Sequence, residues 1–522
     1  MSFARALSRA QLGLEAPLVQ VEAHLGAGLP NFTIVGLPAP VVRESRERVR
    51  AALLSSGYTF PAGRITVNLA PAELSKQGGR FDLPVALALL IAGGQIPEPG
   101  RPFECYGELG LAGEIKPVSG LFLAALHARA AEHALIVPAG CGEEVALSAH
   151  PAAYGAATLR EAAQVLAGNT AECALAVSGQ RDRDDVATEL SPSSLSQVVG
   201  HWYAKRALII AAAGAHSVLL IGPPGSGKSM LAARLPQLLP PLCASEALEV
   251  ASIASTAGLR LDAGHWARRP FRCPHHSASA QAIVGGGPRI RPGEVTLAHH
   301  GVLFLDELPE FDRRVLESLR EPLETGAITI ARAAARLELP ARFQLIAAMN
   351  PCPCGYFGDS VRECHCGAAS VARYRQRISG PLLDRIDLRI DVPRIAGAEF
   401  VDGTLRAGVA REEDAVAQIA RAREWRLHRS GCLSARLDSA ALQSCCAMPR
   451  SAQQLLKSSA QRLALSGRGI HRVLTISRTI ADLAGSETIE VPHLAEAVQL
   501  RRALEDAPAL TAPAIPYSRR PA

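Results

Sequence analysis

Long hydrophobic runs are absent from this sequence. The two most apolar stretches, residues 83–94 and 207–222, are shorter than the roughly 18–20 apolar residues that a membrane-spanning helix needs, and the second contains His216. The first 14 residues contain Arg5 and Arg9 but no apolar segment and cleavage site of the kind that a signal peptide has. These absences predict a cytoplasmic protein with no membrane partner.

Aromatic residues and surplus charge are also scarce. Aromatic residues make up 4% of the chain, so the 48% of hydrophobic residues are mainly Ala, Leu, Val and Ile. That hydrophobic content and the low net charge exclude disorder over most of the chain. Lys and Arg number 55 against 49 Asp and Glu, so the net charge is only +6 and does not by itself indicate a nucleic-acid partner. Any basic surface must therefore be local.

The 522 residues predict about three domains at roughly 100–200 residues each. The predicted segments are an α/β or α+β domain at 1–175, a polar linker at 176–194, a second α/β domain at 195–395, a helical domain at 396–505 and a frayed, proline-rich tail at 506–522. In the first domain, strands are expected at 19–25, 32–35, 65–69 and 135–137, and helices at 41–55 and 83–92.

A glycine-rich loop joins an apolar strand at 218–221 to a predicted helix. The loop is Gly222-Pro223-Pro224-Gly225-Ser226-Gly227-Lys228-Ser229, which matches the G-x-x-x-x-G-K-[ST] pattern of a phosphate-binding loop. The glycines let backbone N–H groups point at phosphate oxygens, and the following helix adds its positive N-terminal end. Lys228 is expected to reach the β- and γ-phosphates of ATP, and the Ser229 hydroxyl is expected to coordinate Mg²⁺.

Two further strands end in polar residues. Residues 302–305 are apolar and are followed by Asp306 and Glu307, while the strand expected at 343–349 ends at Asn350. Ligands bind at the carboxyl ends of parallel strands, so Asp306 is a candidate Mg²⁺ ligand and Glu307 a candidate general base for the attacking water. Asn350 is a candidate for positioning that water. The alternatives are a solvated acidic turn and a turn-forming Asn before proline.

Longer motifs extend the pattern beyond the phosphate loop. They are FRCPHHSAS at 271–279, VGGGPRIRPGE at 284–294, HGVLFLDELPEF at 300–311, NPCPCG at 350–355, SGPLLDRID at 379–387, GIHRVL at 469–474 and RTIADL at 478–483. With these motifs, the sequence resembles the magnesium-chelatase-like AAA+ ATPases, and within them the ComM/YifB group, over nearly the whole chain.

The resemblance implies three folds and one activity. It implies a Lon-protease-like α/β domain at the N-terminus, a P-loop parallel-sheet core with hairpin insertions in its second helix and before sensor 1, and an all-helical lid of the magnesium-chelatase C-terminal type. It further implies a homo-hexameric, DNA-dependent motor that acts as a branch-migration helicase on recombination intermediates during natural transformation.

The resemblance implies roles for two arginines. Arg385 matches the arginine finger that reaches the ATP of the neighbouring subunit; its alternative is an ion pair with Asp384 or Asp387. Arg472 matches the sensor arginine of the lid, and its alternative is ordinary helix-surface charge. The sequence departs from the family at His201, where Gln is usual, and at His300, where Asn is common. Neither residue is expected to touch the phosphate chemistry.

DNA contacts are expected in two insertions. The first is the glycine-rich segment 284–294 with Arg289 and Arg291, and the second is a hairpin of 327–331 and 337–345 with Arg332 and Arg336 near its tip. The resemblance implies that such insertions face the central pore of a hexamer, where arginines would contact phosphates without reading bases. The alternative is a pair of solvated loops.

Four of the twelve cysteines cluster, at Cys352, Cys354, Cys364 and Cys366. Four thiolates on a short loop suit a tetrahedral Zn²⁺ site, although C-x-C is tighter than the usual spacing, and the alternative is four free thiols. His365 is a possible substitute ligand. The pairs His275–His276 and His299–His300 are expected to make hydrogen bonds rather than to bind metal.

The N-terminal domain lacks the Ser–Lys dyad that the resemblance to Lon would suggest. The serine position falls within 79–82, which holds no serine, and the lysine position falls at Ala124. Without a nucleophile and a base this domain has no acyl-transfer mechanism. Three functions remain in competition: a DNA motor, the ATPase subunit of a metal-chelatase-like complex, and an ATP-dependent protein-remodelling factor or protease.

Overall fold

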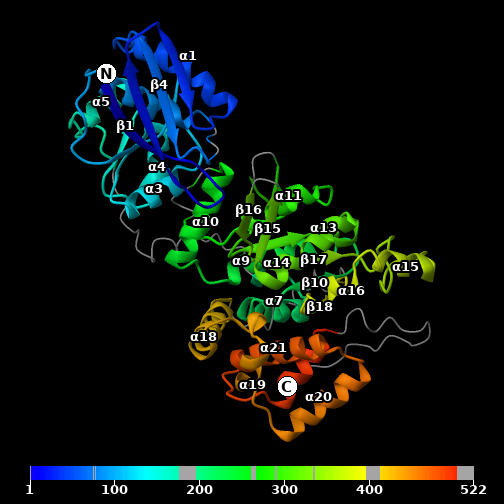
Figure 1. Ribbon diagram of the computed structural model, residues 1–522. Helices are drawn as coiled ribbons and strands as arrows, with labels where there is room; N and C mark the ends of the chain where they lie inside the picture. The colour runs from blue at the N-terminus through cyan, green and yellow to red at the C-terminus, as the bar shows by residue number, and fades with distance from the viewer. Residues whose placement is uncertain are drawn as a thin grey trace.

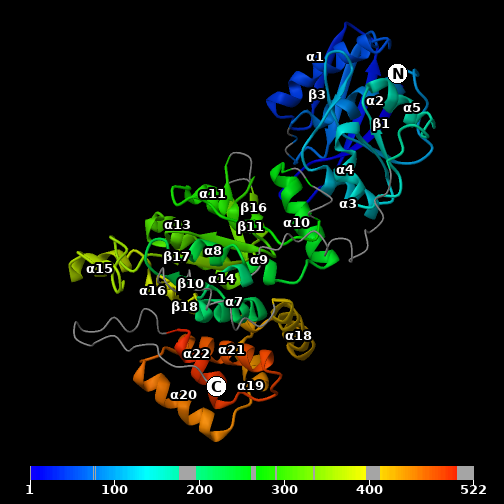
Figure 2. The ribbon, with the colours of Figure 1, turned by 180° about the vertical axis from the view of Figure 1, so that it is seen from behind.

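The computed structural model describes residues 2–74, 76, 78–175, 195–259, 261, 266–287, 291–332, 335–395 and 412–501. The predicted linker at 176–194, the predicted tail at 506–522, the start of the helical domain at 396–411, and Arg289 lie outside these residues. An N-terminal domain lies at one end of the molecule, a helical C-terminal domain at the other, and a sheet domain between them (Figures 1 and 2).

The N-terminal domain is built on a mixed sheet of seven strands, in the order β3-β4-β2-β1-β5-β8-β9. The strands are β1 (Ser2–Arg9), β2 (Leu18–Gly26), β3 (Asn31–Val35), β4 (Arg64–Ala70), β5 (Phe103–Cys105), β8 (Ala134–Pro138) and β9 (Ala153–Ala156). The other elements are α1 (Pro40–Ser55), α2 (Asp82–Ala92), α3 (Leu121–Ala130), α4 (Gly142–Ala146), α5 (Leu159–Leu166) and a hairpin of β6 (Glu108–Leu109) and β7 (Ile115–Lys116). All six elements expected in this domain are present.

Strand β1 was not expected from the sequence, although it lies in the middle of the sheet. It pairs antiparallel with β2 along its whole length and parallel with β5 at Leu7. Its buried face is made of Ala4, Ala6 and Ser8, whereas Phe3 and Arg5 are exposed. The larger apolar side chains therefore do not mark the buried face, and the alternation that indicates a strand is hidden.

The central domain is a parallel sheet of five strands, in the order β11-β14-β17-β10-β18. The strands are β10 (Val218–Ile221), β11 (Phe271–Arg272), β14 (Val302–Leu305), β17 (Gln344–Met349) and β18 (Leu388–Asp391). Its helices are α7 (Trp202–Gly214), α8 (Lys228–Ala232), α9 (Leu235–Leu238), α10 (Ala244–Ala257), α11 (Ala280–Val284), α12 (Glu294–Leu297), α13 (Arg313–Ser318), α14 (Arg320–Thr325), α15 (Ala368–Arg375) and α16 (Gly380–Leu383).

Both faces of this sheet are buried. Val218 and Leu220 of β10 pack into one hydrophobic cluster, and the alternate residues Leu219 and Ile221 pack into another on the opposite face. A strand that is covered on both sides needs apolar residues or fully hydrogen-bonded ones, which explains why β10 and β14 are continuous hydrophobic runs and why β17 is one after Gln344, whose side chain donates to the carbonyl oxygens of Ala211 and His216. Because the strands are parallel, their carboxyl ends, which precede Gly222, Asp306 and Asn350, meet at one edge.

Two hairpins project from the central domain. One pairs β12 (Gly285–Gly286) with β13 (Arg291–Pro292), and the other pairs β15 (Ala327–Arg332) with β16 (Ala335–Pro340). The second hairpin was expected to extend to residue 345, and this is wrong. Strand β16 ends at Pro340, because the chain must leave the hairpin to enter the central sheet, where Gln344 pairs with Val302.

The C-terminal domain is all-helical and packs on the central sheet domain. Its helices are α18 (Glu412–Ser430), α19 (Ser439–Cys445), α20 (Arg450–Arg462), α21 (Gly467–Leu483) and α22 (Val491–Gln499). Apolar residues of these helices join the cluster that α7 and one face of the sheet form. The two domains are also joined by a hydrogen bond of 2.7 Å between His216 Nε2 and Thr479 Oγ1 and by an ion pair of 2.8 Å between Arg206 and Glu496.

The N-terminal domain contacts the central domain chiefly at α10. Gln11 Nε2 donates to the carbonyl oxygen of Thr256 at 3.2 Å, and the rings of Phe122 and Trp266 pack edge-on with centroids 5.8 Å apart. Mixed α/β architecture, a parallel-sheet core and a helical C-terminal domain confirm the fold class that the sequence predicts. Among the described residues, no helix has the length and apolar character to cross a membrane.

Candidate active site

The phosphate loop follows directly from β10 and curls around an open hollow. Gly225 and Gly227 have φ of +76° and +87°, a left-handed conformation that glycine adopts without strain. The hollow has a volume of about 400 Å³ and is lined by Pro224, Gly225, Gly227, Lys228, Ser229, Met230, Asp306, Glu307, Met349 and Asn350. The sequence-predicted loop and the two polar strand ends are therefore brought together in one place.

Lys228 is held inside this loop by oxygen atoms. Its Nζ donates to the carbonyl oxygens of Gly222 and Pro223 at 2.8 and 2.9 Å, and lies 3.3 Å from Oδ1 of Asn350. Burial lowers the pKa of Lys228, and the charges of Asp306 and Glu307 oppose that shift. The buried Oγ of Ser226 has no hydrogen-bond partner among the described residues. A nucleotide phosphate fits this loop, because it would accept from Lys228 and from such orphaned groups.

The acidic strand end places two carboxylates at the edge of the hollow. Asp306 Oδ2 accepts a hydrogen bond of 2.7 Å from Ser229 Oγ, so the two oxygens that the sequence predicts as Mg²⁺ ligands lie together, as such a site requires. Glu307 has a left-handed backbone with φ of +53°, and its side chain is 53% exposed. A non-glycine residue in that region stores backbone strain, which is typical of functional positions.

His276 is a site residue that the sequence analysis missed. Its Nδ1 lies 3.2 Å from Oε2 of Glu307. The residue follows edge strand β11, which pairs parallel with β14, so the carboxyl ends of both strands reach the same place. In the sequence, His276 is marked only by its position shortly after a short strand. That this strand lies next to β14, which brings His276 to Glu307, depends on the strand order of the sheet and cannot be seen in a local pattern of residues.

The two departures from the family lie in different places. His201 lies beside the phosphate loop, with its Nε2 3.7 Å from where a Cβ on Gly227 would be, but it is not among the residues that line the hollow. Burial and the nearby Lys205 lower the pKa of His201, while a hydrogen bond to the backbone of Ser226 opposes the shift. His300 does lie elsewhere, beside Glu246 and Glu249.

Neither candidate arginine lines the hollow of its own subunit. Arg385 forms an ion pair with Glu324 rather than with Asp384 or Asp387, and its Nη1 donates to the carbonyl oxygen of Pro381 at 2.8 Å. Arg472 Nη1 lies 3.2 Å from Oδ1 of the buried Asp387. Burial alone would raise the pKa of Asp387, but the charges of Arg472 and His216 hold it below its usual range.

The candidate DNA residues lie on the two hairpins. Arg291 is exposed on β13, next to residues outside the described part of the chain. Arg332 and Arg336 belong to the last backbone pairs of the second hairpin, Arg332 opposite Ala335 and Ala331 opposite Arg336. The middle of this hairpin meets the N-terminal domain, since Leu337 pairs with Ile330 and a Cβ on Gly13 would be 2.6 Å from Cδ2 of Leu337.

The four clustered cysteines converge as their spacing suggests. Their sulfur atoms all lie within 4.8 Å of one another, with Sγ of Cys352 at 3.3 Å from that of Cys354 and both at 3.6 Å from that of Cys364. Backbone N–H groups of Phe357 and Cys366 point at Cys352 and Cys364, at 3.3 and 3.4 Å. All twelve cysteines of the chain are free thiols. The donor set and its size fit a tetrahedral Zn²⁺ ion.

A second group, Glu249, His299 and His300, has metal-like donors but a different hydrogen-bond pattern. Nδ1 of His299 accepts from the backbone N–H of Arg342 at 2.9 Å, so Nε2 must carry the proton, and it donates to Glu249 at 2.9 Å. A ligating imidazole needs a free nitrogen and normally donates with the other one. The hydrogen-bonding role expected for this histidine pair is therefore the better fit.

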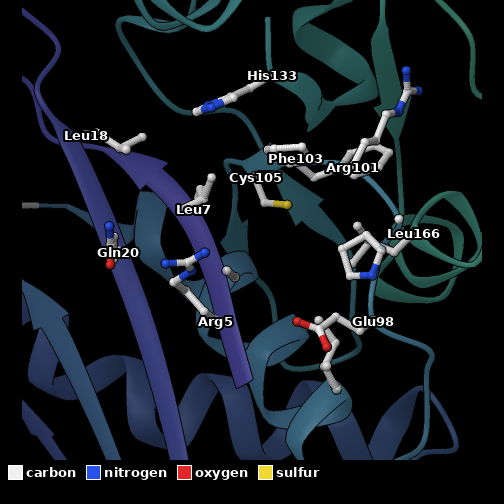
Figure 3. Close-up of a pocket in the computed structure, with 15 residues that line it drawn as sticks. Arg5, Leu7, Leu18, Gln20, Glu98, Arg101, Phe103, Cys105, His133 and Leu166 are labelled. Atoms are coloured by element: carbon white, nitrogen blue, oxygen red, sulfur yellow. The ribbon is translucent and has the colours of Figure 1, made fainter. Parts of the chain in front are cut away.

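The N-terminal domain contains a hollow of about 410 Å³ between β1 and β5 (Figure 3). His133 lines it and is held at Nδ1 by Glu104 at 2.8 Å, and Cys105 lines it with a thiol whose pKa is raised by burial and by Glu104. A thiol in that state is a poor nucleophile. Residues 79–82 and Ala124, where the expected Lon-like dyad would fall, are all buried.

A parallel sheet with an inner strand that enters a phosphate loop, beside an acidic strand end and a helical domain, defines a P-loop ATPase. The family profile described as "Magnesium chelatase, subunit ChlI" matches residues 194–400. Two more, "Subunit ChlI of Mg-chelatase" and "Magnesium chelatase, subunit ChlI C-terminal", match residues 21–140 and 411–501. The class is therefore the magnesium-chelatase-like AAA+ ATPases.

Two of the similar proteins match nearly the whole chain, and a third matches about a third of it. Competence protein ComM of Haemophilus influenzae is 44% identical over 514 residues, which cover 96% of this chain and 98% of that protein. YifB of Escherichia coli is 43% identical over 506 residues, 96% of this chain and 97% of that protein. The magnesium-chelatase 38 kDa subunit of Cereibacter sphaeroides is 26% identical over 182 residues, 31% of this chain and 53% of that protein. The chain belongs to the ComM/YifB family of magnesium-chelatase-like AAA+ ATPases.

Proposed function

We propose that this protein is a cytoplasmic, ATP-dependent DNA motor, a branch-migration helicase that acts on recombination intermediates during natural transformation. The observation that carries the proposal is the connection of the β15–β16 hairpin, which follows the acidic strand β14 and leads directly into β17 and Asn350. A change at the γ-phosphate therefore has a short covalent path to the arginine-bearing tip. The nearly full-length similarity to a protein named for competence supports the pathway.

The hydrolysis chemistry is assigned to the residues around the hollow. Bound Mg²⁺, held by Ser229 and Asp306, would neutralise developing phosphate charge. Lys228 leaves its backbone carbonyl partners for the β- and γ-phosphates, and Asn350 orients the attacking water. Glu307, exposed and adjacent, takes the proton of that water.

The other proposed roles belong to arginines outside the hollow and to the four clustered cysteines. In a homo-hexamer, Arg385 of one subunit would leave Glu324 and reach the γ-phosphate of its neighbour, and Arg472 would reach the nucleotide of its own subunit after the lid moves. DNA would contact Arg289, Arg291, Arg332 and Arg336 through its phosphates. The four clustered cysteines would hold a structural Zn²⁺ ion.

A second candidate function is the ATPase subunit of a metal-chelatase-like complex, which the family profiles favour. It is the weaker candidate, because the similarity to a chelatase subunit covers 31% of this chain. It also predicts a different activator: partner subunits with a porphyrin would stimulate ATP hydrolysis, and branched DNA would not.

The experiment measures ATP hydrolysis with and without a four-way DNA junction. We expect the junction to stimulate hydrolysis, and added salt to abolish the stimulation, because arginines displace counterions condensed on the phosphates. Replacing Arg332 and Arg336 together by Ala should remove the stimulation and leave the basal rate. The matched control replaces Arg313 and Arg314, two exposed arginines of α13. Equal stimulation in both double variants would contradict the DNA assignment.

A further inference from the structure

The cysteine cluster begins immediately after a residue of the candidate active site. Asn350 is the first residue after β17, Pro351 follows it, and the next residue, Cys352, is fully buried. Helix α15, which follows the last cysteine, lies at the end of the central domain opposite α10 (Figures 1 and 2). The loop of residues 351–367, here called the cysteine loop, therefore joins the γ-phosphate side of the site to an outlying helix.

The cysteine loop packs directly on the phosphate loop. A Cβ on Gly355 would lie 2.6 Å from Cδ of Pro224 and 3.7 Å from Cγ of Asn350, and Gly355 has φ of +85°. Only glycine allows so close an approach in that conformation. Gly355 directly follows Cys354 and ends a turn that begins at Cys352, because its N–H donates to the carbonyl oxygen of Cys352 at 3.0 Å. The sulfur cluster thus sets the position of the residue that presses on Pro224.

An arginine ties the same two loops from the other side. Arg394, just beyond β18, donates to the carbonyl oxygen of Pro224 at 3.2 Å. Its Nε lies 3.6 Å from Oδ2 of Asp359, a carboxylate of the cysteine loop whose side chain is 1% exposed. Arg375 of α15 donates to the carbonyl oxygen of Pro351 at 3.2 Å and covers the ring of Phe357. Pro224 is therefore fixed between Gly355 and Arg394.

The cysteine loop has no regular secondary structure to hold its shape. Residues 351–367 form no helix or strand, and half of the side chains of its non-glycine residues are exposed, including Phe357 and Val361. A loop without its own core depends on a cross-link, and four thiolates around one ion are such a cross-link. Without the ion, the four thiols would lose the bonds that cross-link the loop, and the loop would open.

We propose that Zn²⁺ in the cysteine loop clamps the phosphate loop, so that metal occupancy controls the affinity for nucleotide. The inference rests on the zinc and ATP sites of the proposed function and adds the link between them. The ion itself touches no phosphate. It keeps Gly355 against Pro224 and keeps Asn350 beside Lys228, and its loss frees both contacts.

The first experiment compares full-length protein with variants Cys364→Ser and Cys243→Ser. Cys243 is an exposed cysteine outside the cluster and serves as the matched control. We expect one Zn²⁺ per chain in wild type and control, none in Cys364→Ser, and a thiolate charge-transfer spectrum when Co²⁺ replaces Zn²⁺. A fluorescent ATP analogue should bind Cys364→Ser on the order of tenfold more weakly. Equal affinity of zinc-containing and zinc-free protein would overturn the clamp.

The second experiment separates the clamp from the ATPase assignment. Amide hydrogen exchange of residues 222–229 should become faster when Zn²⁺ is removed with a chelator, whether or not nucleotide is added. The variant Arg394→Gln should keep its Zn²⁺ but show the same faster exchange, because it loses the bond to Pro224. Unchanged exchange in the metal-free protein would overturn the clamp even if ATP hydrolysis is confirmed, and a wild-type protein that binds no Zn²⁺ or Co²⁺ would overturn it outright.

Discussion

Single residues of the site owe their position to backbone conformation. Glu307 follows β14 in a left-handed conformation that turns its side chain away from the course of the strand, and His276 approaches it from the neighbouring strand end. Asp306, one residue earlier, instead faces Ser229. Two adjacent carboxylates are thereby given different neighbours and, in the proposed mechanism, different roles.

The Glu307→Gln variant tests this division. Gln keeps the size of the side chain and one acceptor oxygen but cannot take up a proton, so we expect ATP binding close to wild type and a fall in turnover of about 10²–10⁴-fold. The control is Glu310→Gln, a nearby carboxylate that pairs with Arg377 at 2.7 Å. Steady-state ATPase rates and equilibrium binding of an ATP analogue provide the two readouts. Normal turnover by Glu307→Gln would refute the assignment of the base.

Between elements, histidines connect α10 to the start of β14. His299 is 1% exposed, and burial together with the adjacent His300 lowers its pKa to about 4. Helix α10 carries Glu246 and Glu249 toward this pair and carries Thr256 toward the N-terminal domain. The protonation state of this contact therefore bears on the junction between an ATPase element and the N-terminal domain.

We expect this contact to weaken in acid. The pKa of His299 is about 4 in the folded protein and roughly 6.5 when unfolded, so the unfolded chain takes up a proton first as the pH falls. The stabilisation is complete above pH 6.5 and is lost as the pH falls toward 4, at a cost of about 2 kcal/mol by pH 5. Chemical denaturation at pH 8 and 5 would measure this loss.

The His299→Asn variant isolates the effect. Asn keeps an acceptor for the backbone N–H of Arg342 but does not titrate, so its free energy of unfolding should change less between pH 8 and 5 than that of wild type. His24→Asn, at an exposed histidine of β2, should behave as wild type does. The same pH dependence in all three proteins would mean that His299 does not titrate as described.

For the whole molecule, the candidate arginines lie near the contact between sheet domain and helical domain. Arg385 pairs with Glu324, and Arg472 reaches across from α21 to Asp387, which also holds His216. The apolar cluster around α7 continues into the lid, so rotation of the lid would move Arg472. The proposed nucleotide contacts of both arginines require such rearrangement or a neighbouring subunit.

Mixed rings test the contact between subunits. Arg385→Ala should bind ATP but lose about 10³–10⁵-fold in turnover, since a finger acts on transition-state charge. Mixing it with Lys228→Ala protein should restore part of the activity, because some interfaces then combine an intact phosphate loop with an intact finger. Arg373→Ala, an exposed arginine of α15, should retain full turnover alone. Mixtures without recovery, measured over a range of ratios, would count against the finger.

Much of the candidate site was predictable because its parts are local. Residues 222–229 are contiguous, and their glycines, lysine and serine need only a preceding strand and a following helix to form the loop. The acidic strand end and Asn350 were predictable for the same reason, and so was the convergence of four cysteines on one short loop. Strand β1 was missed, since Ala and Ser on its buried face resemble neither a core nor a surface pattern.

The sequence by itself determined the family, the phosphate loop and the residues that can bind ATP and Mg²⁺, because their chemistry depends on side-chain types at fixed spacing. Only the tertiary structure decided that His276 meets Glu307, that Arg472 pairs with Asp387, and that Gly355 presses on Pro224. Each of these contacts joins segments that are distant in the chain. They follow from the strand order and from the packing of two domains, which no local pattern of residues encodes.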